Sequence, residues 1–243
     1  MRCYYKTLTA LHAGTGTELG IVDLPIQRDS LTKFPKIEAS TLKGALKTNL
    51  LSVSEDKKKI YDYLGKESNN EEHEISQIGI GDASLLLFPI ALRKGNYCYI
   101  TCEEIVTDIG DFFNYEKEKE DQLIKLEHYE IKGKKISVRR SVFDINKDIY
   151  CIENKIFKML VENYTEVHTR IKIDDETGTV DEKSGPFTIE YLPRETYLYN
   201  EIFSTSNDGD TLDNFEKYIK NLKPFQIGGN KSLGKGFISI FSK

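Results

Sequence analysis

Apolar residues alternate in some segments of the chain and recur every three or four positions in others, which predicts both strands and helices. Strands are expected at residues 2–12, 78–92, 97–101 and 237–241. Helices are expected to begin at residues 40, 102 and 212. Strand–helix–strand followed by strand–helix–strand is the order of a ferredoxin-like fold. We therefore predict an α+β protein with a ferredoxin-like (RRM-like) core.

The most regular helical pattern follows Ser40. A serine hydroxyl at that position can accept an N–H of the first turn, so Ser40 is expected to be the N-cap. The apolar positions that follow share one face, as in a helix with one buried side: Leu42, Ala45, Leu46 and Leu50.

Polar and irregular segments interrupt this pattern without dividing it. We expect one domain over residues 1–243, with a polar insertion near residues 55–75 and a variable middle segment near residues 105–165. A protruding hairpin is expected near residues 168–192, turning at DDETG.

Composition places the chain among folded globular proteins, since 39% of its 243 residues are hydrophobic and 30% are charged. No apolar run approaches the roughly 20 residues that span a bilayer, and the start lacks the apolar core of a signal peptide. The four cysteines are scattered, which favours reduced, packed thiols in a cytoplasmic protein without membrane contact. The net charge of −5 weighs mildly against nucleic acid, but the cluster KGKKISVRR leaves room for a basic groove.

The segment GNKSLGKG resembles the phosphate-binding pattern GxxxxGK[ST] but lacks its last residue, because Gly236 replaces the hydroxyl that would hold magnesium. A strand rather than a helix is expected after it, so an ATPase is disfavoured. Backbone N–H groups beside lysines could still bind a phosphodiester, and a flexible turn is the alternative. The residues expected to contact phosphate are Gly228, Gly229, Lys231, Gly234 and Lys235.

Four segments, in order, resemble blocks of the RAMP superfamily. LHAGTGTELGIVDLPIQRDSLTKFPKIEASTLKGALK resembles the N-terminal signature, most closely that of the Cas-seven group, the backbone subunits of type III-B (Cmr) CRISPR effector complexes. IGIGDASLLLFPI resembles the second block, HTRIKIDDETGTV with EYLPRETYLY resembles the thumb hairpin, and QIGGNKSLGKGF resembles the glycine-rich loop. Residues 105–165 match little of the family pattern.

The resemblance implies a subunit that stacks with further copies of itself along a crRNA, beside other subunits, and binds target RNA. A grip on the guide backbone is implied for Ser40, Lys43 and Lys47, together with Arg28. The alternative for the two lysines is an ordinary solvated helix face. In the thumb, the apolar side chains that could wedge between bases are Ile171, Ile173 and Val180.

The resemblance also implies cleavage of the target RNA at regular intervals. Asp23 matches the family's catalytic aspartate and would hold Mg²⁺ or another divalent metal, although it could also be a turn residue before Leu24-Pro25. His12 matches an auxiliary position, with packing at a strand end as its alternative, and Glu190 is a second candidate carboxylate. A non-catalytic crRNA-binding module, the type III-A (Csm) equivalent and a guide-processing endonuclease remain as alternatives. The last fits VDLPIQRD poorly.

Overall fold

In the computed structural model of the chain, the described residues are 1–17, 20–66, 75–110, 112–139, 145–173, 179, 185–206 and 208–242. The helices within them are α1 (Ala39–Val53), α2 (Lys57–Leu64), α3 (Glu103–Ile109), α4 (Asn154–Asn163), α5 (Thr211–Lys220) and the 3₁₀ turn η1 (Lys231–Leu233). The strands of the first half are β1 (Arg2–Thr7), β2 (Lys36–Ile37), β3 (Ile78–Ile80), β4 (Ala83–Ala91), β5 (Tyr97–Cys102), β6 (Phe113–Asn114) and β7 (Gln122–Lys125). Those of the second half are β8 (Glu130–Val138), β9 (Ile149–Ile152), β10 (Glu166–Arg170), β11 (Phe187–Tyr191), β12 (Tyr197–Ser204), β13 (Phe225–Gln226) and β14 (Phe237–Ser242).

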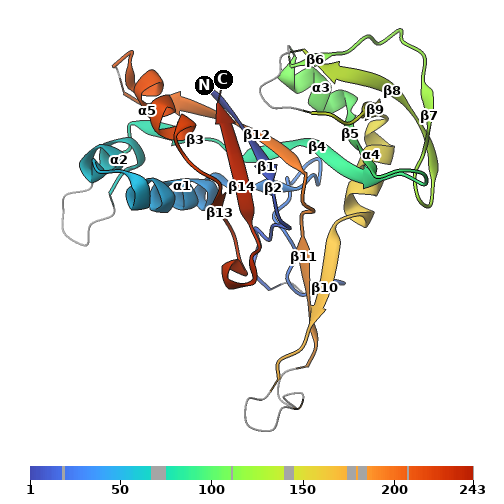
Figure 1. The fold of residues 1–243 in the computed structure, drawn as a ribbon, viewed down its shortest axis with the longest axis horizontal. Helices are drawn as coiled ribbons and strands as arrows, with labels where there is room; N and C mark the ends of the chain where they lie inside the picture. Colours follow the sequence, from blue (N-terminus) through green and yellow to red (C-terminus); the bar gives the residue numbers. More distant parts are fainter. Residues whose placement is uncertain are drawn as a thin grey trace.

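The centre of the fold is an antiparallel sheet in which β14, β1, β12 and β4 lie side by side. In the chain α1 follows β1, and α5 separates β12 from β14, so the predicted ferredoxin-like order is confirmed. Helices α1, α2 and α5 cover one side of this sheet (Figure 1). The expected apolar face of α1 is buried, because Leu42, Leu46 and Leu50 are all at most 1% exposed.

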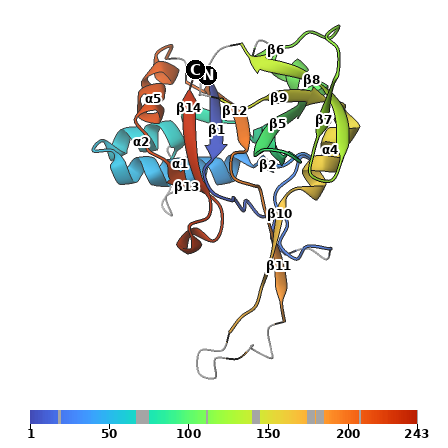
Figure 2. The same ribbon diagram turned by 45° about the vertical axis from the view of Figure 1, so that its right-hand side comes forward.

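The chain between β4 and β12 forms an inserted lobe that continues the same sheet. β4 pairs with β5, β5 runs parallel to β9, and β8 follows on the far side of β9. Helices α3 and α4 accompany these strands, opposite α1, α2 and α5 (Figures 1 and 2). Tyr4 of β1 stacks on Phe112 of the lobe at a centroid distance of 5.0 Å, which joins the two parts of the core.

A two-stranded hairpin projects away from both parts (Figures 1 and 2). Its strands β10 and β11 pair only with each other among the described strands, from Glu166 opposite Tyr191 to Arg170 opposite Phe187. The predicted turn at DDETG and Val180 lie outside the described residues.

Several predicted boundaries were wrong. The first strand ends at Thr7, and the apolar run 78–92 is two strands separated by Gly81 and Asp82. Within the polar insertion, Asp56 accepts the N–H of Lys59 at 3.0 Å and starts the unforeseen helix α2. The helix expected after Cys102 stops at Ile109, because Gly110 turns to a φ of 56°.

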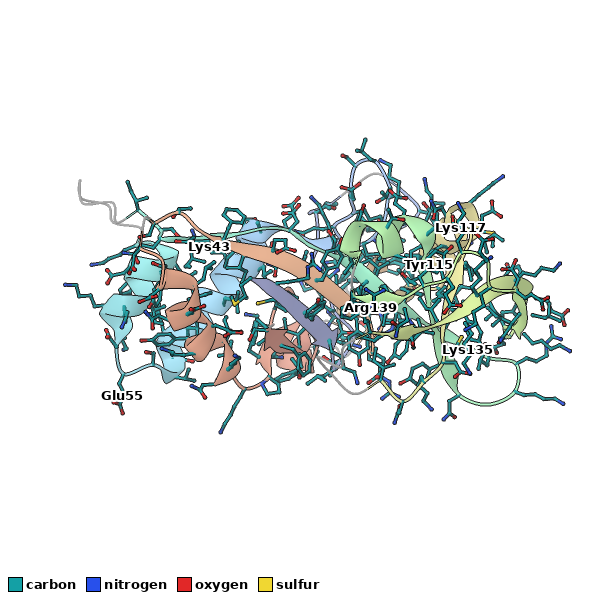
Figure 3. All side chains as sticks on the ribbon, turned by 90° about the horizontal axis from the view of Figure 1, so that it is seen from above. Lys43, Glu55, Tyr115, Lys117, Lys135 and Arg139 are labelled. Atoms are coloured by element: carbon teal, nitrogen blue, oxygen red, sulfur yellow. The ribbon has the colours of Figure 1, made fainter. Side chains whose placement is uncertain are left out.

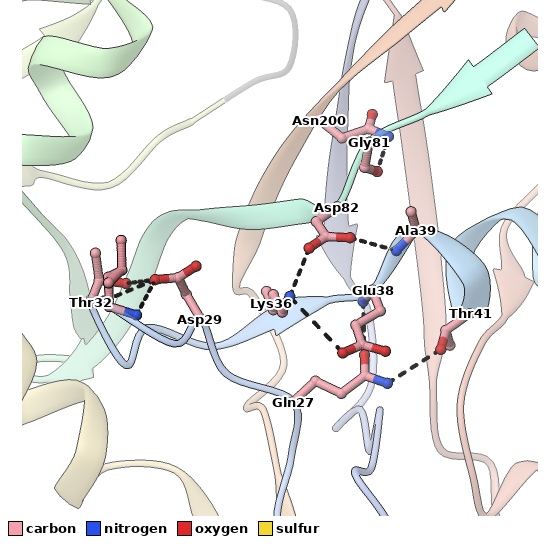
Figure 4. Close-up of polar contacts among 11 residues, drawn as sticks. Gln27, Asp29, Thr32, Lys36, Glu38, Ala39, Thr41, Gly81, Asp82 and Asn200 are labelled. Atoms are coloured by element: carbon pink, nitrogen blue, oxygen red, sulfur yellow. Dashed lines mark hydrogen bonds and ion pairs between the residues drawn. The ribbon is translucent and has the colours of Figure 1, made fainter.

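Ser40 is not the N-cap of α1, since the helix already begins at Ala39. The cap is supplied from a distant part of the chain. Asp82 accepts a hydrogen bond from the N–H of Ala39 at 2.8 Å and forms an ion pair with Lys36 at 2.7 Å (Figure 4). Burial opposes ionisation of Asp82, but these two partners outweigh it and hold its pKa below the ordinary value. A protein carboxylate therefore already lies at the positive end of this helix.

Candidate catalytic loop and nucleic-acid interface

Asp23 lies exposed in the loop after β1, at the base of the projecting hairpin. Its Oδ2 accepts the N–H of Thr188 at 2.7 Å and the Thr188 hydroxyl at 2.8 Å. The N–H of Asp23 in turn donates to Thr188 Oγ1 at 3.0 Å. Two hydrogen bonds lower the pKa of Asp23: the one from the Thr188 N–H has the larger effect, and the one from the Thr188 hydroxyl adds to it. The side chain is therefore a carboxylate at neutral pH. These three bonds show that Asp23 ties its loop to β11.

Glu190 is buried and fully partnered, unlike a carboxylate that waits for a metal ion. Its Oε1 accepts from the Arg28 guanidinium and from the Thr165 hydroxyl, and its Oε2 accepts the N–H of Ile26 at 3.0 Å. The side chain is 7% exposed. Glu190 and Arg28 are therefore better assigned to holding the loop against the hairpin than to catalysis or RNA contact.

His12 meets the same strand two residues from Thr188. Its Nδ1 lies 2.7 Å from the carbonyl oxygen of Glu190, which only accepts, so Nδ1 carries the proton and Nε2 of a neutral ring is the acceptor. A Cβ at Gly14 would stand 2.5 Å from that Nε2. Gly14, which the sequence did not single out, therefore keeps the imidazole nitrogen open. Because His12 and Asp23 attach at β11 positions two residues apart, their anchor points lie about 7 Å apart.

The glycine-rich loop differs from the expected phosphate cradle. The N–H of Gly229 donates to His12 O at 2.9 Å, that of Gly234 to Lys231 O at 3.0 Å, and that of Gly236 to Ala10 O at 2.9 Å. Gly228 has a φ of +80°, and a Cβ there would stand 2.2 Å from His12 O. Gly228, Gly229 and Gly236 therefore place the loop against residues 10–12, and the N–H groups of Gly229, Gly234 and Gly236 are not free to bind a phosphate.

A polar cluster that the sequence did not reveal joins this loop to the hairpin. Asn230 accepts from Arg170 at 2.7 Å and donates to the Tyr191 hydroxyl at 3.0 Å. Lys235 Nζ lies 5.0 Å from the centre of the Tyr191 ring. Two cations, Arg170 and Lys235, thus lie where the glycine-rich loop meets the hairpin, whereas Lys231 is exposed at the loop's tip.

Lys43 and Lys47 line a hollow of about 590 Å³ between α1 and the end of α2. Ser40 and Lys66 line it too, and among the described residues no carboxylate lines it. The Nζ atoms of Lys47 and Lys66 each lie 5.6 Å from the centre of the Tyr61 ring. Both ammonium groups therefore make a cation–π contact with the same ring. Lys66 and Tyr61 belong to the segment that we took for a polar insertion.

Other basic residues lie on the inserted lobe, away from this hollow (Figure 3). In the run KGKKISVRR, Lys134 pairs with Asp121 and Lys135 with Asp148, each at 2.7 Å. Two of the five basic residues of this run are therefore neutralised within the protein. On the hairpin, Ile171 and Ile173 are each 51% exposed. Both follow the paired part of β10.

The described residues contain no group of three or more histidine, cysteine, aspartate or glutamate side chains arranged for a metal ion. A magnesium ion needs only one or two protein carboxylates when phosphate oxygens and water complete its shell. Asp23 fits such a site, because its Oδ1 has no hydrogen-bond partner in the described part of the chain. The four cysteines are buried and unpaired, and burial raises the pKa of each thiol to about 12, which confirms packed, reduced thiols. Among the described helices, none has the length and apolar character to traverse a bilayer.

The profile of the RAMP superfamily matches residues 4–239, and the chain belongs to this superfamily. Within it, the chain is 34% identical to the "CRISPR system Cmr endoribonuclease Cmr4" of Pyrococcus furiosus, over 98% of this chain and 93% of that protein. It is 25% identical to the "CRISPR system CMR subunit Cmr4" of Saccharolobus solfataricus, over 98% and 94% of the two chains.

Solved structures show the same fold. A chain of the type III-B Cmr-beta complex in its apo state superposes with a TM-score of 0.81 at 24% identity, covering 100% of this chain and 96% of that one. Oligomeric Cmr4 from Pyrococcus furiosus superposes with a TM-score of 0.71 at 24% identity, covering 100% and 99%.

Proposed function

We propose that this protein is a backbone subunit of a type III-B effector complex, which stacks along the crRNA and cuts the bound target RNA at regular intervals. The observation that carries the proposal is the exposed, ionised Asp23 fixed to the base of the projecting hairpin. A relative at 34% identity that is named an endoribonuclease supports it. Its partners would be crRNA, target RNA, further copies of itself and other effector subunits, in the cytoplasm.

The reaction that suits this loop is attack of a ribose 2′-hydroxyl on the adjacent phosphorus. The hydroxyl loses its proton, its oxygen bonds to phosphorus, the bond to the 5′-oxygen breaks, and that oxygen takes a proton from water. The products carry a 2′,3′-cyclic phosphate and a 5′-hydroxyl. When the His12 ring is neutral, its Nε2 is the acceptor nitrogen that would take this proton. A Mg²⁺ or other divalent ion held by Asp23 would supply positive charge to the phosphate oxygens. Arg170 and Lys235 would hold the neighbouring backbone.

The hollow between α1 and α2 supports the guide-binding part of the proposal. Three lysines, with no carboxylate among the described lining residues, favour a phosphodiester. Tyr61 limits the freedom of Lys47 and Lys66 before RNA binds. Contact through the backbone alone lets one protein accept any guide sequence.

A non-catalytic binding module is the second candidate, and one observation favours it. Glu190, the other carboxylate expected near Asp23, is occupied by Arg28, Thr165 and Ile26. Asp23 is therefore the one carboxylate we assign to a metal ion.

The test compares Asp23→Asn with wild-type protein in a reconstituted complex with crRNA and labelled target RNA. An asparagine oxygen can still accept both bonds from Thr188, so the loop stays in place while the charge is lost. We expect cutting to fall by about a hundredfold or more, with target affinity unchanged. Asp23→Ala should lower cutting at least as much and loosen the loop as well. An undiminished product ladder from Asp23→Asn would rule out the catalytic role, and a wild-type complex that never cuts would establish the binding module.

A further inference from the structure

We propose that Thr188 is a positioning residue for Asp23, and that through it the candidate catalytic carboxylate is mounted on the hairpin. This inference rests on the proposed function. It adds a condition to that function: cleavage takes place only where the hairpin is bound to the guide–target duplex.

The contact between the two residues uses both the hydroxyl and the N–H of Thr188. Its hydroxyl donates to Asp23 Oδ2 at 2.8 Å and accepts the N–H of Asp23 at 3.0 Å. Its own N–H donates to the same Oδ2 at 2.7 Å. Because both donors converge on Oδ2, the carboxylate has one orientation and presents Oδ1.

The backbone on either side extends this contact into a short parallel ladder. The N–H of Leu24 donates to Thr188 O at 3.0 Å, and the N–H of Glu190 donates to Leu24 O at 3.0 Å. The N–H of Ile26 then donates to the Glu190 carboxylate. Residues 23–26 therefore behave as a third strand at the edge of β11.

In the described part of the chain, β10 and β11 form a separate two-stranded sheet, and a few contacts attach it to the body. Leu11 forms a bridge with Leu192, His12 contacts Glu190 O, and Asn230 is hydrogen-bonded to Arg170 and Tyr191. Because residues 23–26 are bonded to β11 itself, they would follow any shift of the hairpin. Binding of the hairpin to a guide–target duplex would thus hold the Asp23 carboxylate at a fixed distance from that duplex. When the hairpin is not bound, the carboxylate would not be positioned for cleavage.

The experiment replaces Thr188 with valine, which has the same shape but no hydroxyl. In the assembled complex with crRNA, we expect single-turnover cutting of bound target RNA to fall about tenfold, as for the loss of one charge-assisted hydrogen bond. Target affinity should not change. Thr188→Ser restores the hydroxyl and should return cutting to near the wild-type rate. Thr169→Val is the matched control, since exposed Thr169 lies opposite Thr188 on β10 and makes no hydrogen bond to Asp23.

A second readout does not depend on activity. Amide hydrogen exchange of residues 20–26 should be faster in Thr188→Val than in wild type or Thr169→Val, and target RNA should slow this exchange in wild type. Cutting and exchange both at wild-type levels in Thr188→Val would overturn the inference. So would a failure of Thr188→Ser to restore cutting. If Asp23→Asn still cuts, the proposed function itself fails, whereas an inactive Asp23→Asn beside a fully active Thr188→Val rejects the positioning role alone.

Discussion

Glu195 has a left-handed backbone conformation, with a φ of 69°, which is uncommon outside glycine. Its N–H donates to Thr7 O, and its Oε2 accepts from the hydroxyls of Tyr97 and Tyr99 at 3.0 Å and pairs with Lys6 at 2.8 Å. Burial alone would raise the pKa of Glu195, but Lys6 and the two tyrosines outweigh it and lower the pKa. One side chain therefore joins the central sheet to the inserted lobe, and it does so only as a carboxylate.

This contact predicts a loss of stability in acid. A carboxyl group whose folded pKa is lowered stabilises the fold above its unfolded pKa, and this contribution disappears as the pH falls through the folded pKa. The expected window lies below the ordinary glutamate value of 4.5. Glu195→Gln should be about 1–2 kcal/mol less stable at neutral pH and should lose less on further acidification. Thermal unfolding at a series of pH values measures both effects.

Glu201→Gln is the control, because the ion pair of Glu201 with Arg2 leaves the glutamate side chain 52% exposed. Exposed pairs contribute little, so this variant should follow the wild-type pH profile closely. Parallel profiles for Glu195→Gln and wild type would show that the cluster does not stabilise the fold through charge.

At the level of elements, the sequence pattern predicted the helices and strands whose buried faces depend on neighbouring residues in the chain. The apolar faces of α1 and α5 and the alternation in β14 are visible in the sequence, because a buried face requires apolar residues at the period of its element. The cap of α1 was not visible, since Asp82 lies 43 residues from Ala39. A short helix such as α2 was also missed, because only Ile60, Tyr63 and Leu64 among its residues are buried.

The same division holds at the candidate site. Asp23 lies in an exposed loop, but its partner Thr188 is 165 residues away. Arg28 is likewise 162 residues from Glu190. Charge alone could not separate an exposed carboxylate from one buried in an ion pair, because both are acidic residues beside turns in the sequence. Glycines likewise mark tight backbone approach and phosphate binding equally well, and the contact between Gly228 and His12 O favours the first.

The hollow between α1 and α2 yields a prediction about salt. Replacing Lys43 and Lys47 with alanine should weaken crRNA binding by a similar factor for all guide sequences. The slope of log affinity against log salt should become shallower by about 1.4, since each phosphate contact to a single strand contributes about 0.7. The control replaces Lys134 and Lys135, which are paired with Asp121 and Asp148 and should leave the slope unchanged. Equal slopes for all three proteins would mean that Lys43 and Lys47 face solvent only.

Across the whole molecule, two different sides flank the hairpin. Helices α1, α2 and α5 with the lysine hollow lie on one side, and the inserted lobe with its paired charges lies on the other (Figures 1 and 3). Copies that meet head to tail through unlike sides form an open filament rather than a closed ring or dimer, unless the rotation closes.

We therefore expect the purified protein to self-associate and to carry RNA. Size-exclusion chromatography with light scattering should show a series of species whose mass grows with the length of added single-stranded RNA. Ribonuclease treatment should collapse the series, because the filament depends on the shared strand. A monomer free of nucleic acid at every salt concentration would contradict the assembly.

The position of β1 has a consequence for synthesis. Tyr5 pairs with Leu198 on one side and with Ile240 on the other, so the first strand finds its neighbours only near the end of translation. Such distant pairing slows folding. It also leaves an aromatic strand edge exposed on the nascent chain, where it can pair with other chains. A ribosome that stops early thus releases a chain that lacks its central sheet and is prone to aggregate through its unpaired first strand.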